Sequence, residues 1–189
     1  MGVIARERYL QKLIDCKENG MIKVITGNIM KIKLIYGYDY KEEVKTLFNE
    51  YTQDIIDHEK SFEYYLKLQN YDDEINNLET VYSLPMNRLY LLVIDDVIAG
   101  SVVLKYKDDE SCELKRLYVK REYRGHGYGY YLTNHIIKVA KEIGYKYMYL
   151  DTFAFLDKAL IIYKKIGFYE IPKYNNNPID HAIYMKLDL

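Results

Sequence analysis

From about residue 30 onward, the hydrophobic positions of this chain follow first an extended period and then a helical one. Met30 to Tyr36 predicts a strand. Tyr40 to Ile56 predicts an amphipathic helix, because its apolar residues recur every three or four positions. Ser61 to about Tyr82 predicts a second, less regular helical region with a break near Asn70 to Asp73.

The middle of the chain changes to extended segments separated by charged turns. Three strands are predicted, at Leu89 to Ile94, Val97 to Tyr106 and Cys112 to Val119. Because the connections between them are short, the three strands are expected to pair as an antiparallel meander.

The last third of the chain alternates between strands and helices. A glycine cluster leads into a helix that ends at Ile143 and is capped by Gly144. The elements expected after it are a strand at Tyr147 to Asp151, a helix at Leu156 to Ile166, and strands at Phe168 to Ile171 and Ala182 to Leu187. This order predicts an α/β (α+β) fold with a mixed, mostly antiparallel central sheet flanked by helices.

Size and composition limit the class of protein. With 189 residues, of which 49% are hydrophobic, the chain has the size of one folded domain with a short appendage. Cys16 and Cys112 lie far apart with no CxxC motif and no histidine cluster, so neither a disulfide framework nor a metal site is expected. No run approaches the ~20 apolar residues of a membrane span, and no apolar signal core follows the N-terminus, so we expect a cytoplasmic protein.

Charge is informative locally rather than globally. The net charge of -1 gives no argument for binding nucleic acid or an acidic membrane. However, three of the six arginines, Arg116, Arg121 and Arg124, fall within nine positions. Between Glu113 and Arg124, five basic residues face two acidic ones, a local balance of +3. Since the planar guanidinium binds phosphate and carboxylate, this segment is a candidate anion site, or else a solvated strand end.

The segment Arg124 to Gly129, RGHGYG, lies between a predicted strand and a helix N-terminus. Free backbone N–H groups and the helix dipole favour anions there. A dinucleotide-binding fingerprint requires glycine where this chain has Tyr130, and a Walker loop requires Gly-Lys-Ser/Thr at the helix start, which is absent. The alternative to an anion-binding loop is that these glycines only form a turn.

Taken together, these motifs resemble those of the GNAT acetyltransferase superfamily. The resemblance rests on KRLYV followed by R-G-x-G-x-G, on the YLDT strand, on A-x-x-x-Y-x-K-x-GF from Ala159 to Phe168, and on YNNNP followed by AIYMKLDL. It covers Met30 to Leu189 and implies one N-acetyltransferase domain with the GNAT acyltransferase fold. It also implies acetyl-CoA as cosubstrate and no metal.

The resemblance further assigns the coenzyme site. In the superfamily the glycine motif holds the pyrophosphate of acetyl-CoA, while the preceding strand pairs with the amides of the pantetheine arm like an added strand. The coenzyme-binding residues implied here are Leu117, Val119, Arg124, Gly125, His126, Gly127, Tyr128, Gly129 and Tyr130. One coenzyme contact is expected to be missing, because Leu156 stands where many relatives carry asparagine.

Acetyl transfer to an amine needs a group that accepts the amine's proton and one that protonates the leaving thiolate. Glu113 is the candidate base, and strand alternation is expected to place it on the same face as Leu117 and Val119. The alternative for Glu113 is an ion pair with a neighbouring basic side chain. Tyr163 matches the superfamily's tyrosine near the coenzyme sulfur; in a chain with 23 tyrosines, the alternative is a core residue.

The acceptor is expected to be a primary amine of a small molecule that attacks directly in a ternary complex. By the same resemblance, its pocket is expected to include Tyr51, Arg116, Tyr174 and Asn177, with Arg116 as a clamp for an acceptor carboxylate. Two alternatives stay open: a non-catalytic acetyl-CoA sensor that regulates a protein partner, and acetylation of a protein amine. No nucleic-acid or membrane partner is expected, and no motif decides whether the chain forms a homodimer.

Residues 1–29 are predicted to be an N-terminal extension of the 30–189 domain. Residues 1–27 resemble the start of a bacterial P-loop ATPase, but the chain departs from it at Asn28, before any phosphate-binding loop. We therefore expect no ATP binding and interpret the extension as a remnant of a gene fusion or rearrangement.

Overall fold

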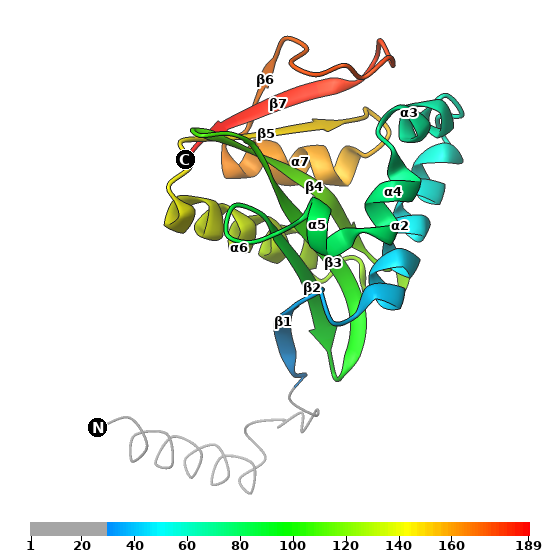
Figure 1. The fold of residues 1–189 in the computed structure, drawn as a ribbon, viewed down its shortest axis with the longest axis vertical. Helices are drawn as coiled ribbons and strands as arrows, with labels where there is room; N and C mark the ends of the chain where they lie inside the picture. The colour runs from blue at the N-terminus through cyan, green and yellow to red at the C-terminus, as the bar shows by residue number, and fades with distance from the viewer. Residues whose placement is uncertain (1–29) are drawn as a thin grey trace, which may run out of the picture. The chain divides into compact units, whose positions relative to one another are not determined.

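The computed structural model describes residues 30–189, in which one seven-stranded sheet carries helices on both faces (Figure 1). The predictions for residues 1–29 lie outside the described residues. The strands follow the sheet order β1 (Ile32–Tyr36), β2 (Arg88–Ile94), β3 (Val97–Asp108), β4 (Ser111–Val119), β5 (Tyr147–Thr152), β7 (Ile183–Asp188) and β6 (Tyr169–Ile171). Neighbours are antiparallel except for the parallel pair β4 and β5, which confirms the predicted mixed sheet and its meander.

The helices divide between the two faces. One face carries α2 (Lys41–Ile56), α3 (Phe62–Leu68), α4 (Tyr71–Asn76) and α5 (Leu78–Val81); the other carries α6 (Tyr128–Ile143) and α7 (Asp157–Ile166), with a 3-10 turn at Arg121–Tyr123 before α6 (Figure 1). The predicted break in the second helical region is at Asn70, whose φ of 54° is left-handed. A further interruption at Asn77 separates α4 from α5. No helix of residues 30–189 is long and apolar enough to cross a membrane.

Burial of two apolar stripes fixes the helices on the sheet. Leu132, Ile136 and Ala140 of α6 are fully buried against β3 and β4, as their helical spacing predicts. On the opposite face, Val44 and Phe48 of α2 are fully buried in a second cluster. Each such large side chain contributes about 1.5–3 kcal/mol on leaving water. The loop that precedes α6 is thereby anchored at the end of β4.

A β-bulge at Arg116 interrupts β4. The register passes from Ser101 opposite Tyr118 to Val103 opposite Lys115, so β4 uses one residue more than β3 over this stretch. Arg116 takes a left-handed φ of 51°, and its carbonyl oxygen accepts a hydrogen bond from Ser101 Oγ at 2.9 Å. An extra residue in one strand reverses which face the following side chains occupy.

The bulge changes where the predicted base lies. Leu114, before the bulge, packs in the cluster under α6, and Leu117 and Val119, after it, pack against that same cluster. Glu113 therefore faces the opposite side, toward α3 and α4. The expectation that Glu113 shares a face with Leu117 and Val119 is wrong, because simple alternation takes no account of the inserted residue.

Strands β4 and β5 separate soon after they meet. They pair only at Ser111 with Tyr147, Cys112 with Met148 and Glu113 with Tyr149. From Leu114 onward, β4 keeps β3 on one edge, and among residues 30–189 no strand pairs with its other edge. Unpaired strand edges expose backbone N–H and C=O groups that are ready to pair with an extended ligand.

Candidate active site

A cavity of about 440 Å³ lies where β4 and β5 diverge. It is lined by β4 from Leu114 to Val119, by Asp151 to Phe153 at the end of β5, and by side chains from α2, α3 and α7. This volume is within the range of small-ligand pockets. Leu117 and Val119, both expected to bind the coenzyme, lie on the unpaired edge of β4 and line this cavity.

The glycine loop before α6 has a backbone that only some residues tolerate. Gly125 and Gly127 have φ of 86° and 81°, in the left-handed region that costs residues with a Cβ about 1–2 kcal/mol. The N–H of Tyr131 donates to Gly127 O at 3.0 Å and is the first donor of the α6 hydrogen-bond ladder. The N–H groups just before it have no intrahelical acceptor, as at every helix start. The loop thus offers the donors that an anion requires.

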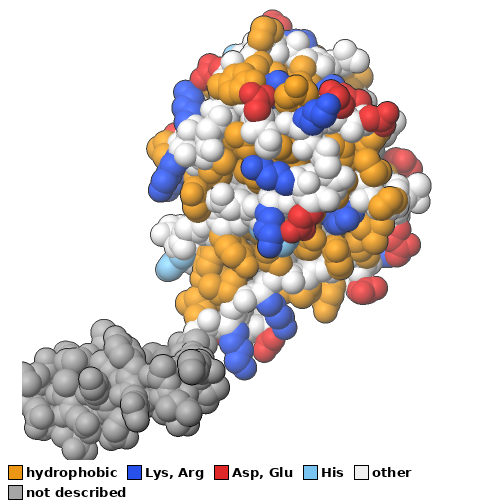
Figure 2. Space-filling view, turned by 90° about the vertical axis from the view of Figure 1, so that its left-hand side faces the viewer, with side chains coloured by type: hydrophobic (Ala, Val, Ile, Leu, Met, Phe, Trp, Pro, Cys, Tyr) orange, Lys and Arg blue, Asp and Glu red, His pale blue; other side chains and the backbone are white. Residues whose placement is uncertain are grey.

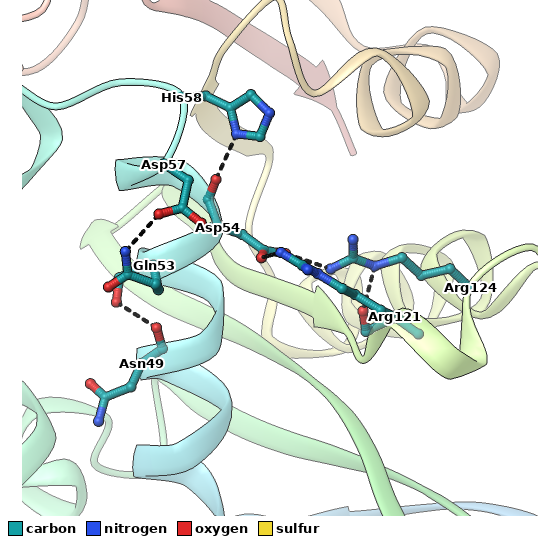
Figure 3. A network of polar contacts seen from close by, with 9 residues as sticks. Asn49, Gln53, Asp54, Asp57, His58, Arg121 and Arg124 are labelled. Atoms are coloured by element: carbon teal, nitrogen blue, oxygen red, sulfur yellow. Dashed lines mark hydrogen bonds and ion pairs between the residues drawn. The ribbon is translucent and has the colours of Figure 1, made fainter.

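Two arginines of this region are bound to a carboxylate from α2 (Figure 3). Asp54 accepts hydrogen bonds from Arg121 and, at 2.8 Å, from Arg124 Nη2. Arg124 Nε also donates to the carbonyl oxygen of Val119 at 2.8 Å. Partial burial works against the charge of Asp54, but hydrogen bonds and positive charge from Arg124 and Arg121 hold the pKa of Asp54 below its usual value. These contacts fix the entrance to the glycine loop.

Arg116 is occupied by a buried partner. Its Nε and Nη2 donate to the two carboxylate oxygens of Glu74 at 2.8 and 2.7 Å, and the two side chains are 3% and 7% exposed. Burial opposes the charge of Arg116, but Glu74 more than offsets it, so the pKa of Arg116 is raised. This arrangement contradicts the expected clamp for an acceptor carboxylate, because the guanidinium fork is already filled.

Glu74 and Asp54, the acidic partners of these arginines, change the local charge. Between Glu113 and Arg124 the sequence carries +3, but Glu74 and Asp54 from distant helices reduce it to +1. Basic and acidic side chains are likewise interspersed on the face of the molecule in Figure 2. The anion-binding capacity of the loop consequently depends on backbone donors more than on the sum of arginine charges.

Glu113 lies beside the main cavity rather than in its lining. It lines a neighbouring pocket with Lys105 and Lys115, and the two pockets share Tyr65, Gln69 and Lys115. Within the described residues Glu113 forms no ion pair, so the alternative of a neighbouring basic partner is not realised. Burial, followed by the negative charge of Glu113, raises the pKa of Tyr174.

Tyr163 is buried and lines the main cavity. Its ring packs against Phe168 with centroids 5.6 Å apart. Burial, with smaller effects from Tyr51 and Asp151, raises the pKa of Tyr163. The phenol therefore stays protonated at neutral pH and is chemically able to donate a proton.

Of the three remaining acceptor candidates, Tyr51 lines the main cavity, whereas Tyr174 and Asn177 are not in its lining. Tyr51 lines the cavity, and burial raises its pKa to about 12. Asn177 is fully buried, and its Nδ2 donates to Asp151 Oδ2 at 3.0 Å. Tyr174 is half-buried and packs against Tyr184 with centroids 5.7 Å apart. The sequence analysis did not identify Asp151 as a cavity residue. The pattern that could have identified it is an acidic residue in a strand whose alternate residues, Met148 and Leu150, are apolar.

Comparisons with known proteins agree with this geometry. The family model described as the acetyltransferase (GNAT) family matches residues 42–168. An uncharacterized N-acetyltransferase of Schizosaccharomyces pombe is 33% identical over 172 residues, covering 89% of this chain and 99% of its own length. Another, from Dictyostelium discoideum, is 29% identical and covers 85% of this chain and 100% of its own. The likeness of residues 1–27 to a P-loop ATPase is not borne out, since the matched family begins beyond them.

Solved structures share the fold. A GNAT-family acetyltransferase of Staphylococcus aureus superposes with a TM-score of 0.67 at 22% identity, covering 84% of this chain and 99% of its own. The PaiA N-acetyltransferase of Thermoplasma acidophilum, solved in complex with coenzyme A, gives 0.63 at 20% identity, with 85% and 99% covered. The chain therefore belongs to the GNAT family of acetyltransferases, and it is an N-acetyltransferase.

Proposed function

We propose that this N-acetyltransferase moves the acetyl group of acetyl-CoA to a primary amine of a small molecule, by direct attack in a ternary complex. The observation that carries the proposal is the unpaired edge of β4 from Leu114 to Val119, which opens into a cavity of about 440 Å³. An amide-bearing pantetheine arm suits such an edge because it can complete the backbone hydrogen bonds. The loop Arg124 to Tyr130 would hold the pyrophosphate on its N–H groups.

The chemistry requires two proton transfers. The amine nitrogen forms a bond to the thioester carbonyl carbon, the carbon–sulfur bond breaks, and the electron pair leaves on sulfur as a thiolate. We assign the proton on that thiolate to Tyr163, because its phenol lines the cavity and is protonated at neutral pH. We assign the proton lost by the amine to Glu113, reached directly or through water from the adjoining pocket.

A small acceptor is favoured by the shape of the cavity. Its walls come from α2, α3, β4, β5 and α7, so an acceptor lies among side chains rather than on an open surface. We keep a metal-independent reaction and a cytoplasmic location as predictions. A lysine side chain of a protein is the acceptor to be compared with small amines.

The coenzyme part is tested by calorimetry of acetyl-CoA with the full chain. Gly127→Glu places a negative charge and a Cβ at the left-handed N-cap of α6, and should weaken binding at least tenfold. Gly144→Glu is the matched control, because Gly144 is left-handed at the other end of α6. It should bind within twofold of the unmodified chain. Equal binding by the Gly127→Glu protein would refute the coenzyme site.

The acceptor part is tested by thiol release from acetyl-CoA. The protein is incubated with a panel of primary alkyl- and arylalkylamines and with a lysine-containing peptide. The proposal predicts faster release with at least one small amine than with the peptide. Faster release with the peptide would instead assign a protein amine, and coenzyme binding with no release from any amine would support a sensor.

A further inference from the structure

Asp151 is the half-buried aspartate of the main cavity that has no basic partner among the described residues, because Asp54 is paired with arginines and Asp157 is exposed. The lining aspartates are Asp54, Asp151 and Asp157. Asp54 is bound to two arginines, and Asp157 Oδ1 accepts a hydrogen bond from the N–H of Lys158 in the first turn of α7 at 2.7 Å. Asp151 forms no ion pair with any residue from 30 to 189. A half-buried carboxylate in a cavity stabilises a cationic ligand if one is present.

A fixed hydrogen bond orients the Asp151 carboxylate. The side chain of Asn177 is held by its Oδ1, which accepts the N–H of Ile179 at 2.9 Å. This contact identifies the opposite end of the amide as Nδ2, which donates to Asp151 Oδ2 at 3.0 Å. Asn177 is fully buried and holds Asp151 Oδ2, and no described residue forms a hydrogen bond with Asp151 Oδ1, so this oxygen can accept one from a ligand in the cavity.

Several tyrosines line the same cavity as this carboxylate or lie opposite it in the sheet. Tyr51, Tyr65 and Tyr163 line the same cavity, and the negative charge of Asp151 contributes, after burial, to raising the pKa of each. In the sheet, Asp151 lies opposite Tyr184. Tyr184 is 7% exposed, and its buried hydroxyl makes no hydrogen bond with the described residues.

We propose that Asp151 binds the ammonium group of the acceptor and selects a cationic amine whose body is aromatic or apolar, with Asn177 as a positioning residue. The inference rests on the proposed function and deepens it. An ammonium can donate to the carboxylate while its carbon body lies against tyrosine rings, which attract cations through their faces. Arg116 does not compete for Asp151, because its fork is filled by Glu74.

The test uses the full chain saturated with coenzyme A, so that binding is measured without turnover. Benzylamine and benzyl alcohol are titrated separately and followed by ligand-observed NMR. The unmodified protein should bind benzylamine at least tenfold more tightly than benzyl alcohol. Asp151→Asn, which keeps the size of the side chain and an acceptor for Asn177, should remove this preference and leave the coenzyme affinity within twofold.

Asp180→Asn is the matched control. Asp180 is an exposed carboxylate whose charge also raises the pKa of Tyr184, but it does not line the cavity. It should keep the preference for the amine. If the Asp151→Asn protein keeps that preference too, or loses it together with coenzyme affinity, the inference is overturned.

A measurement on the unmodified chain tests the inference even if the Asp151→Asn protein fails to fold. N,N-Dimethylbenzylamine, protonated at neutral pH, keeps the charge and one N–H donor of benzylammonium but cannot form a stable amide. The inference requires it to bind more tightly than benzyl alcohol, and equal affinity for the cation and the alcohol overturns it. Failure of coenzyme A to bind at all would instead overturn the proposed function.

Discussion

The buried ion pair between Arg116 and Glu74 makes a quantitative prediction about stability. It joins the bulge of β4 to α4 across 42 positions of sequence. Glu74 also accepts a hydrogen bond from Tyr82, and the guanidinium lies over the rings of Phe48, Tyr51 and Tyr71. Replacing Glu74 by glutamine keeps the size of the side chain but leaves Arg116 buried without a counter-charge.

The expected magnitude follows from the burial of both partners. Removing one member of a buried pair typically costs about 3–5 kcal/mol. Glutamine still offers one acceptor and the three rings still face the cation, so we expect the lower end, about 3 kcal/mol. With a urea m-value of about 2 kcal/mol/M, the unfolding midpoint should fall by about 1.5 M.

The control is Glu79→Gln on the neighbouring α5. Glu79 pairs with Lys41 at 3.0 Å, but these side chains are 62% and 54% exposed. Exposed pairs contribute about 0–1 kcal/mol, so this variant should barely move the midpoint. Equal midpoints for the two variants would refute the reasoning. So would an Arg116→Met protein of unchanged stability that loses affinity only for acceptors bearing a carboxylate, because Arg116 would then be a clamp.

The same pair predicts a pH dependence. Burial alone would raise the pKa of Glu74, but Arg116 and Tyr82 more than offset it, so the folded-state pKa lies below the ordinary 4.5. A depressed pKa means that the contribution to stability is fully present above the unfolded value and is lost as pH falls through the folded one. The unmodified protein should therefore lose stability below about pH 4.5 more steeply than the Glu74→Gln protein.

Three further predictions concern the site. Tyr163→Phe should lower kcat by about a hundredfold with little change in KM, and an unchanged kcat would remove Tyr163 from the proton-donor role. Glu113→Gln should alter the pH-rate profile of acetyl transfer; an identical profile would argue against it as the base. Asp54→Asn should strengthen acetyl-CoA binding severalfold at low salt, measured by calorimetry, because Arg121 and Arg124 become free for phosphate. Weaker binding would show instead that Asp54 positions these arginines.

Local signals predicted much of this fold. The spacing of apolar residues identified α6 and its buried face, and Gly144 ends that helix with a left-handed φ of 106°. The strand, glycine loop and helix order likewise indicated the anion-binding loop. Such features depend on residues within a few positions of one another, which is the range over which sequence patterns carry information.

The partners of the charged residues were not predictable in the same way. Asp54 meets Arg124 across 70 positions, and this contact exists only because α2 packs against the sheet. The bulge at Arg116 was equally hidden, since a strand pattern read by alternation has no sign of an inserted residue until the register with β3 is known. That single insertion decided which face Glu113 occupies.

The long-range contacts also separate the site into two regions of opposite character. The donors of the glycine loop follow the end of β4 at Val119, whereas Glu113 lies near its start and Asp151 faces the same side from β5. Glu113 lies six strand residues from Val119, about 20 Å, and Asp151, level with Lys115 in the parallel register, lies about four residues from it, about 13 Å; both distances exceed the Debye length of about 8 Å at physiological salt. At these distances the acids do not cancel the attraction of the loop for phosphate. An anionic coenzyme and a cationic amine can therefore each be recruited by its own end of the strand, with the unpaired backbone of β4 between them.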